Sequence, residues 1–416
     1  MSQGNATMLL RLGWSARRRR GAVVCVALIG TLLAAGVTSG APTQQALEGN
    51  PFRGRSLFVD KLCIECHSVW GHGGAVGPEI VRVVAGKSLQ QLSGEFWNHT
   101  PRMIEEITTR GYDWPTIERD EMADLLNYLY YLRLFDDPGD PVRGVAIYER
   151  HRCGVCHALG GEGGIVGQPL DKFSAYTSPV PLAQAMWNEG PAMRQAQTAT
   201  GTPIPQFSAN EVVDLQAYIR EHGTRGGDER VTLLSLPDPA HGEEVFRNKR
   251  CLACHGTGRA GAPDLGAAAL RMSAAEISGI LWNHSYAMQN QMAEVGIPFP
   301  RFRDNELADL ISYLHLIGYR GQKGDASRGA RVWSEKGCLT CHDNQNVDAP
   351  DLVSSQVWAD TIALSSAMWN HAPDMHDLMG EHGVPWPKFE ERDMEDLTAY
   401  LQQLSSRAPK AEPDDR

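Results

Sequence analysis

The sequence predicts a helical protein built from four tandem copies of one unit. Three observations lead to this prediction. The pattern Cys-x-x-Cys-His occurs four times in the 416 residues, and its histidines are 90, 98 and 87 residues apart. The same flanking residues surround each pattern in the same order. Each copy also closes with a segment whose apolar residues recur at i, i+3, i+6 and i+7, the spacing of an amphipathic helix.

The overall composition is that of a folded protein. Apolar residues make up 42% and charged residues 21%, which excludes a wholly disordered or collagen-like chain. The net charge of −11 argues against a nucleic-acid partner. Length alone indicates about three domains at roughly 150 residues each. The repeat indicates four smaller domains instead.

Residues 1–41 are predicted to be a signal peptide or an N-terminal membrane anchor. Four consecutive arginines, Arg17 to Arg20, precede an uncharged apolar run at residues 21–37. The run fits either a cleaved export signal or an uncleaved anchor. Both predict an exported protein, either periplasmic or anchored in the inner membrane and facing the periplasm. Cys25 is interpreted as a small apolar residue of this segment. The exported part then has 39 − 5 = 34 bases against 50 acids, a net charge of −16.

The other eight cysteines form four pairs, each followed by a histidine. They are Cys63, Cys66 and His67; Cys153, Cys156 and His157; Cys251, Cys254 and His255; and Cys338, Cys341 and His342. This is the attachment pattern of c-type haem, in which two thioethers hold the porphyrin and the histidine is an axial iron ligand. Redox dithiols, zinc sites and disulfides are disfavoured, because four such patterns at even spacing in one chain are not a coincidence. Zinc would also require two pairs to converge, whereas each pair has its own complete repeat around it. We therefore predict four covalent haem c groups.

Other recurrent positions predict how each unit is built. They are a glycine nine residues before the first cysteine (Gly54, Gly144, Gly242, Gly329), a proline after the motif (Pro78, Pro169, Pro263, Pro350) and a Trp-Asn pair beginning at Trp97, Trp187, Trp282 and Trp369. The glycine would let a first helix approach a second one closely. The proline carbonyl is a candidate acceptor for the other nitrogen of the histidine. The tryptophan is interpreted as a core residue or a porphyrin contact, and the asparagine as bonding a propionate or a backbone group.

A methionine six residues after each tryptophan is the candidate second axial ligand. The four are Met103, Met193, Met288 and Met375, which follow their histidines by 36, 36, 33 and 33 residues. Pro101, Pro191 and Pro373 are expected at the first position of a helix, which places three of these methionines in its first turn. Histidine is the competing ligand at His99, His284 and His371. The second copy has Glu189 at that position, so a histidine ligand shared by all units fails there.

Each unit resembles a class I cytochrome c domain, and the resemblance covers residues 50–404. It implies small all-α domains at residues 50–136, 142–223, 239–320 and 326–404, followed by a polar tail at 405–416. It also implies covalent haem, one-electron transfer and His/Met ligation that pairs His67 with Met103, His157 with Met193, His255 with Met288 and His342 with Met375. The short interval from histidine to methionine departs from many family members. Tetrahaem cytochrome subunits of photosynthetic reaction centres are similar in haem count, and their ligand methionines lie on helices before each Cys-x-x-Cys-His motif. The first unit here cannot follow that plan, because no methionine lies between Met8 and Cys63.

The function expected from these features is that of an exported tetrahaem electron carrier. Its partners are expected to be redox proteins with a basic docking patch, because the exported part is acidic. Two alternatives stay open. One is a peroxidase-like haem oxidoreductase, which requires one unit with an open iron site. The other is a cytochrome subunit of a membrane-bound or extracellular electron-transfer assembly.

Overall fold

The computed structural model of the chain describes residues 48–134, 138–208, 210–224, 236–256, 261–263, 265, 272–342, 349–352 and 356–407. The predicted signal or anchor, with Cys25, lies outside these residues, as does the tail beyond Arg407. Within the described ranges no helix has both the length and the apolar character needed to cross a membrane. We call residues 48–134, 138–224, 236–321 and 322–407 the first, second, third and fourth units.

The first two units share one order of elements. The first contains α1 (Pro51–Asp60), α2 (Cys63–Cys66), β1 (Ser68–Val69), β2 (His72–Gly73), α3 (Ile80–Val84), α4 (Leu89–Thr109) and α5 (Arg119–Leu132). The second contains α6 (Pro141–Arg150), the 3₁₀ turn η2 (Cys153–Val155), β3 (Ala158–Leu159), β4 (Glu162–Gly163), the 3₁₀ turn η3 (Leu170–Phe173), α7 (Val180–Thr200) and α8 (Glu211–His222). Each has one antiparallel hairpin of two residues per strand, β1 with β2 and β3 with β4.

The described parts of the other two units repeat the helices. The third contains α9 (Pro239–Asn248), α10 (Leu252–His255), α11 (Ala274–Glu294) and α12 (Glu306–Tyr319). The fourth contains α13 (Ala326–Glu335), the 3₁₀ turns η5 (Cys338–Thr340) and η6 (Gln356–Ala359), α14 (Thr361–Glu381) and α15 (Asp393–Arg407). The predicted all-α fold is confirmed, and the two short hairpins are the described exceptions.

The recurrent glycine brings the first and last helices of each unit together, as predicted. A Cβ at Gly54 would lie 2.0 Å from the carbonyl oxygen of Asp124, and one at Gly144 would lie 2.2 Å from that of Asp214. The same holds at Gly242 against Asp309 and Gly329 against Asp396, both at 2.0 Å. Any side chain would therefore push α1 off α5, α6 off α8, α9 off α12 and α13 off α15.

The aspartate opposite each glycine also holds the start of the first helix. Asp214 accepts a hydrogen bond from the backbone N–H of Asp140 at 2.7 Å and pairs with the Arg143 guanidinium at 2.7 Å. Asp396 does the same with Asp325 and Arg328, and Asp124 does so with Asn50 and Arg53. In the third unit His241 replaces the arginine, and its Nδ1 lies 2.7 Å from Asp309. All four carboxylates are buried, so each needs these donors.

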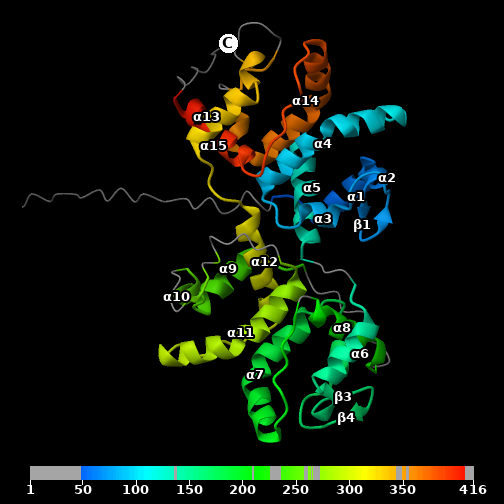
Figure 1. The fold of residues 1–416 in the computed structure, drawn as a ribbon, viewed down its shortest axis with the longest axis vertical. Helices are drawn as coiled ribbons and strands as arrows, with labels where there is room; N and C mark the ends of the chain where they lie inside the picture. Colours follow the sequence, from blue (N-terminus) through cyan, green and yellow to red (C-terminus); the bar gives the residue numbers. More distant parts are fainter. Residues whose placement is uncertain are drawn as a thin grey trace, which may run out of the picture. The chain divides into compact units, whose positions relative to one another are not determined.

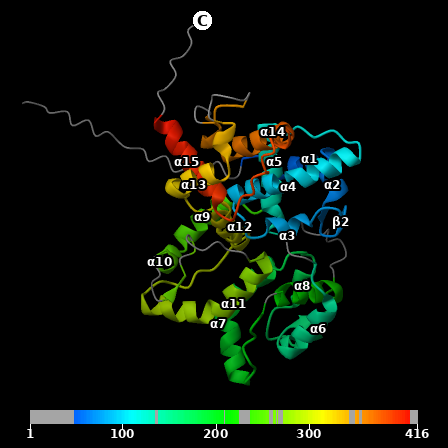
Figure 2. The same cartoon turned by 45° about the horizontal axis from the view of Figure 1, so that its top comes forward.

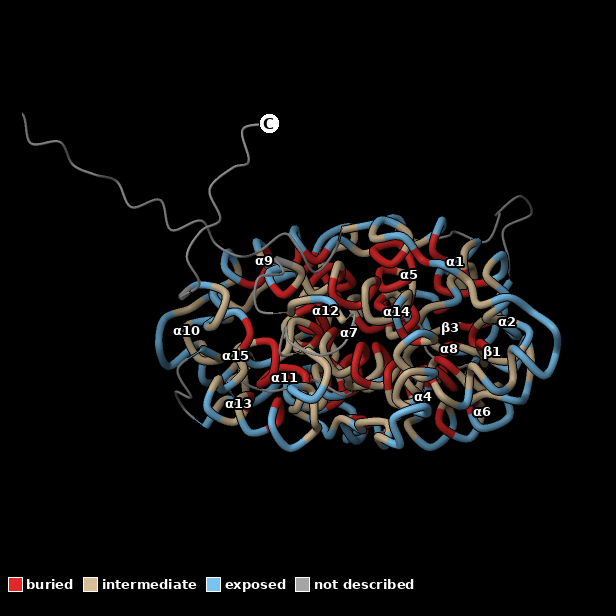
Figure 3. The backbone as a smooth tube through the Cα atoms, turned by 90° about the horizontal axis from the view of Figure 1, so that it is seen from above, coloured by how far each residue is buried: buried red, intermediate tan, exposed pale blue. Residues whose placement is uncertain are grey.

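The four units associate in two nested pairs, the first with the fourth and the second with the third. The long helices of partner units contact each other, α4 against α14 and α7 against α11 (Figures 1 and 2). Partner residues enter each other's cores. Trp282 belongs to the second unit's core, and Trp187 belongs to the third unit's core. The buried backbone follows α5 and α12 through the interior, while α2 and α10 lie toward the outside (Figure 3).

Candidate haem sites

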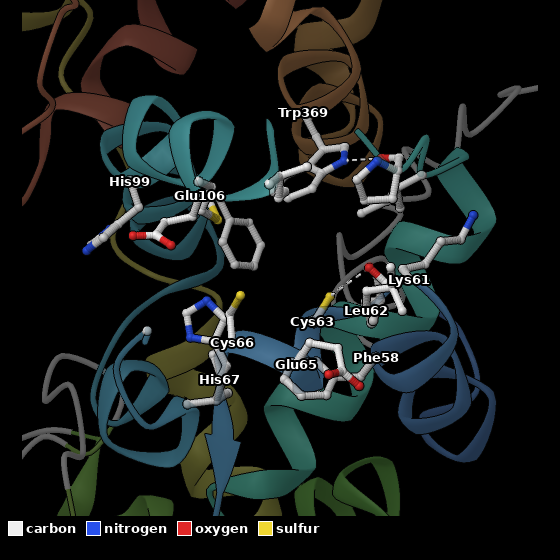
Figure 4. A pocket seen from close by; sticks show the side chains of 18 of the residues that line it. Phe58, Lys61, Leu62, Cys63, Glu65, Cys66, His67, His99, Glu106 and Trp369 are labelled. Atoms are coloured by element: carbon white, nitrogen blue, oxygen red, sulfur yellow. Dashed lines mark hydrogen bonds between the residues drawn. The ribbon is translucent and has the colours of Figure 1, made fainter. Parts of the chain in front are cut away.

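The first unit encloses a cavity of about 390 Å³ beside its Cys-x-x-Cys-His motif (Figure 4). The motif supplies Cys63, Cys66 and His67, and α4 supplies Met103 and His99. The predicted ligands His67 and Met103 therefore line one cavity, although 36 residues separate them. Figure 4 shows His99 across the cavity from His67. The volume falls within the roughly 300–1,000 Å³ of small-molecule and cofactor sites.

A backbone carbonyl orients the histidine of each motif. The Nδ1 atom of His67 lies 2.9 Å from the Pro78 carbonyl oxygen, that of His255 3.1 Å from Pro263 and that of His342 3.0 Å from Pro350. The Nδ1–H group donates this bond, which leaves Nε2 with its lone pair free to bind a metal. The predicted proline acceptor is confirmed in these three units.

The second unit uses a different acceptor for the same bond. His157 Nδ1 lies 2.7 Å from the carbonyl oxygen of Gln168, so the prediction of Pro169 is wrong. The reason is a shift of one residue. Gln168 and Pro78 each lie 11 residues after their histidines, whereas Pro169 lies 12 after its own. The acceptor carbonyl therefore lies at the same distance along the chain from the histidine as in the first unit, although it belongs to a glutamine and not to a proline.

The first cysteine of each motif is half-buried. Burial raises the pKa of the Cys63 thiol to about 11, and the same cause raises the pKa values of Cys153, Cys251 and Cys338 to about 11. A high pKa keeps the thiol protonated at neutral pH, which is opposite to the lowered pKa of redox-active dithiols. The first cysteine of each motif therefore lacks the low pKa that is typical of a redox-active thiol.

The second unit encloses a matching cavity of about 370 Å³. Its wall includes Cys153, Cys156 and His157 from the motif and Met193 from α7. Glu189, which stands where other units have histidine, also lines this cavity, and it pairs with Arg301 of the third unit at 2.6 Å. The departure from histidine in this copy therefore coincides with a contact between the paired units.

The third and fourth motifs follow the first helix of their units, α9 and α13, as the first two motifs follow α1 and α6. Cys251 and Met288 both pack against the third unit's core, and Cys338 packs against the fourth unit's core. Met375 is half-buried on α14. His284 and His371, the competing candidates, are exposed on the same helices. His284 Nδ1 bonds the Ile280 carbonyl at 3.0 Å, one turn earlier in its own helix, as His99 does with Glu95 at 2.9 Å.

The predicted helix starts at Pro101, Pro191 and Pro373 are wrong. All three prolines lie inside helices of 21 residues. In α4 the true start is Leu89, where Ser88 and Gln91 form a capping box. A proline inside a helix leaves the carbonyl four residues earlier without its N–H partner. The partner unit supplies that donor in two cases. Trp386 Nε1 donates to the Trp97 carbonyl at 3.0 Å, and Trp114 Nε1 donates to the Trp369 carbonyl at 3.1 Å.

The recurrent Trp-Asn pair joins the paired units. The indole N–H of each tryptophan donates to a proline carbonyl of the partner: Trp97 to Pro387 at 2.9 Å, Trp369 to Pro115, Trp187 to Pro300 and Trp282 to Pro205, each at 2.7 Å. Each asparagine exchanges two hydrogen bonds with the partner's backbone: Asn98 with Phe389, Asn370 with Ile117, Asn188 with Phe302 and Asn283 with Phe207. The interpretation of a backbone-bound asparagine is confirmed, with the bonded backbone belonging to the partner unit. Trp97, Trp187 and Trp282 are buried core residues, whereas Trp369 is half-buried.

Sequence reasoning missed two groups of residues near the sites. A Cβ at Gly77 would lie 2.4 Å from the His67 ring, and one at Gly167 would lie 2.2 Å from the His157 ring. Trp114 and Trp386 stack on Trp369 and Trp97, with ring centroids 4.4 and 4.2 Å apart. The signal for the second group was present in the sequence, because both tryptophans directly precede the last proline of the recurrent turn.

Comparison with known proteins identifies the family. The family model described as cytochrome c matches residues 52–133, 239–317 and 326–405, which are segments of the first, third and fourth units. No curated protein and no solved structure matches the chain. The three matches together cover more than half of the 416 residues. They contain three of the attachment motifs whose histidines are oriented by a proline carbonyl. The chain is a multi-domain c-type cytochrome and belongs to the cytochrome c family.

Proposed function

We propose that this chain is an exported tetrahaem cytochrome that passes single electrons between redox partners. Haem-based electron transfer follows from the family. The number of haems, their ligands, the export and the partners are our proposal. Haem c supplies a one-electron couple at its iron when bound. The cysteines of each motif would attach the haem, and the histidine of each motif, oriented by a backbone carbonyl, would bind its iron.

The observation that carries the proposal is the repeated bond from histidine Nδ1 to a backbone carbonyl. It occurs at all four motifs, between 2.7 and 3.1 Å. A surface histidine needs no such fixed tautomer, whereas a metal ligand does, because the bond would orient Nε2 toward a bound iron and raise the basicity of Nε2. The second unit, which lies outside the family matches, has the shortest of the four bonds. This supports counting it as a fourth haem site.

His/Met ligation is the proposed state of all four irons. Met103 and Met193 line the cavities of His67 and His157, and the four candidate methionines are all half-buried. Replacing each methionine by histidine in turn tests this ligation. Each change should remove about a quarter of the methionine-to-iron charge-transfer absorption of the oxidised protein and lower one midpoint potential. Met272→His in the third unit is the control, because this methionine is half-buried against the core and does not recur at a fixed offset. Full retention of the band in any one of the four variants would exclude that methionine as a ligand.

The proposed partners present a basic patch. The chain beyond residue 41 carries 34 basic and 50 acidic residues, and acidic surfaces attract basic ones over a distance that salt shortens. The second-order rate constant for electron transfer to a basic cytochrome or other basic carrier should therefore fall steeply as ionic strength rises. An acidic carrier of similar potential is the control and should show the opposite trend. A rate that does not depend on salt with the physiological partner would contradict this part of the proposal.

A further inference from the structure

The wall of the first cavity includes a residue that another unit supplies. Trp369 belongs to α14 of the fourth unit, yet it lines the cavity together with Cys63, His67 and Met103. Figure 4 shows its side chain reaching from that helix toward the cavity. Trp369 lies 302 residues after His67 in the sequence. The wall of the first site is therefore incomplete without the fourth unit.

Residues of the first unit hold the Trp369 ring in place. The indole N–H donates to the Pro115 carbonyl at 2.7 Å. Trp114 stacks on one face with centroids 4.4 Å apart, and Phe96 meets the ring edge-on at 6.3 Å. The Trp114 indole in turn donates to the Trp369 carbonyl at 3.1 Å. Four contacts from the first unit thus determine where this side chain of the fourth unit lies.

We propose that Trp369 is a haem-contact residue of the first site, so that the fourth unit sets the environment of the first unit's haem. The inference rests on the proposed function, namely that this cavity holds haem c. An apolar ring in the wall keeps water away from the group, and a drier site favours the reduced, less charged iron. Removing the ring should therefore lower the potential of the first haem and leave the fourth unit's own haem unchanged.

The test needs a label that distinguishes the two haems. Cys63→Ala removes one thioether from the first haem and leaves one vinyl group conjugated with the porphyrin, which shifts its α band to longer wavelength. Cys338→Ala labels the fourth haem in the same way. Each labelled full-length protein is then combined with Trp369→Ala or Trp369→Phe and titrated potentiometrically at the wavelength of the label. Trp358→Phe is the matched control, because Trp358 lies in the fourth unit's own core and donates to Leu352 within that unit.

The expected result is a lower midpoint potential at the first label for Trp369→Ala, a smaller decrease for Trp369→Phe, which keeps an aromatic ring, and no change at the fourth label. Trp358→Phe should leave the first label unchanged. If Trp369→Ala does not fold, Trp369→Phe carries the test. An unchanged first label, or a shift confined to the fourth label, would overturn the inference.

Failure of the proposed function would look different. If Cys63→Ala produces no shifted α band and the purified protein carries no haem at this motif, the first site is not a haem site at all. If the band appears and the midpoint potential at that label is unchanged by the Trp369 substitutions, the haem is present and only the proposed contact with Trp369 is contradicted.

Discussion

Single glycines determine how closely the helices of each unit pack. Gly54→Ala would place a Cβ 2.0 Å from the Asp124 carbonyl oxygen, so α1 must move away from α5. Overpacking of this kind costs about 1–3 kcal/mol or more. We expect the midpoint of urea unfolding to fall accordingly in the holoprotein.

Gly380→Ala is the matched control for Gly54→Ala. Gly380 lies in α14, and a Cβ there would meet nothing within 4 Å. Alanine is the better helix former by about 0.5–1 kcal/mol, so this variant should be as stable as the parent or slightly more stable. Equal stability of the two variants would contradict the close packing of α1 on α5.

The residue scale is also where the sequence was most informative. The recurrence of Gly54 and its counterparts predicted the helix contact, and the recurrence of proline predicted three of the four histidine acceptors. The aspartates that bind the helix starts recur just as regularly, yet nothing in the sequence identifies their partners 68 to 74 residues away. A polar residue that recurs in every unit indicates that it makes a contact, but it does not identify the residue with which the contact is made.

At the scale of the helix, the interior prolines were mispredicted because their compensation comes from elsewhere. Pro101 removes an N–H donor, and Trp386 of the fourth unit bonds the carbonyl that is freed at Trp97. Local rules place a proline at a helix start, since no local donor can replace its own. Only the paired unit makes the longer helix possible.

A double-mutant cycle tests this compensation. Trp386→Phe keeps a ring, as Phe299 does where it stacks on Trp187 at 4.6 Å, but it leaves the Trp97 carbonyl without a donor. The loss should be about 1–3 kcal/mol of unfolding free energy. Adding Pro101→Ala restores an N–H within the helix, so the same Trp386→Phe change should then cost about 1 kcal/mol less. Purely additive effects of the two changes would argue against the compensation.

At the scale of the whole molecule, a tyrosine and histidine cluster joins the two pairs of units. Tyr130 of α5 donates to the Ser312 carbonyl at 2.6 Å, and Tyr319 of α12 donates to the Leu126 carbonyl at 3.0 Å. The two rings lie 5.2 Å apart, and the Arg133 guanidinium lies 4.7 Å from the centre of the Tyr319 ring. His315 is buried in α12. Burial and the nearby Arg133 charge lower its pKa to about 4.

This pKa predicts how stability depends on pH. Between pH 4 and the unfolded value of 6.5, the unfolded His315 binds a proton that the folded one does not. The free energy of unfolding should therefore fall as the pH is lowered through this window, by roughly 3 kcal/mol in total. His315→Gln should remove this slope, as measured by denaturant unfolding at several pH values.

His241→Gln is the control with the opposite sign. The hydrogen bond from His241 to Asp309 raises the pKa of this histidine above 6.5. Its stabilising contribution is present below that value and is lost as the pH rises through the folded pKa. The variant should thus differ from the parent most at low pH and least above neutrality. Identical pH profiles for the parent and His315→Gln would contradict the buried neutral His315.

The nested pairing of units is the part of the fold that the sequence did not predict. The Trp-Asn recurrence suggested a feature within each unit, whereas Trp97 bonds a carbonyl 290 residues away. A repeat reveals that units share one structure, and it does not show which copies face each other. The order of the four repeats and the helical character of each unit followed from local spacing. The association of first with fourth and second with third depends on long-range surfaces that only the folded chain defines.

The number of haems per chain is the most direct test of the proposed function. The family matches cover three units, while the second unit is assigned from Cys153, Cys156, its cavity and the bond from His157 to the Gln168 carbonyl. The measurement is the molar ratio of covalently bound haem to protein. Haem is quantified by pyridine haemochrome absorbance and protein by amino-acid analysis, and the intact mass of the chain is an independent check. Four haems per chain are predicted, falling to three when both Cys153 and Cys156 are changed to alanine. A ratio of three in the unaltered protein, unchanged by that double substitution, would contradict the tetrahaem assignment.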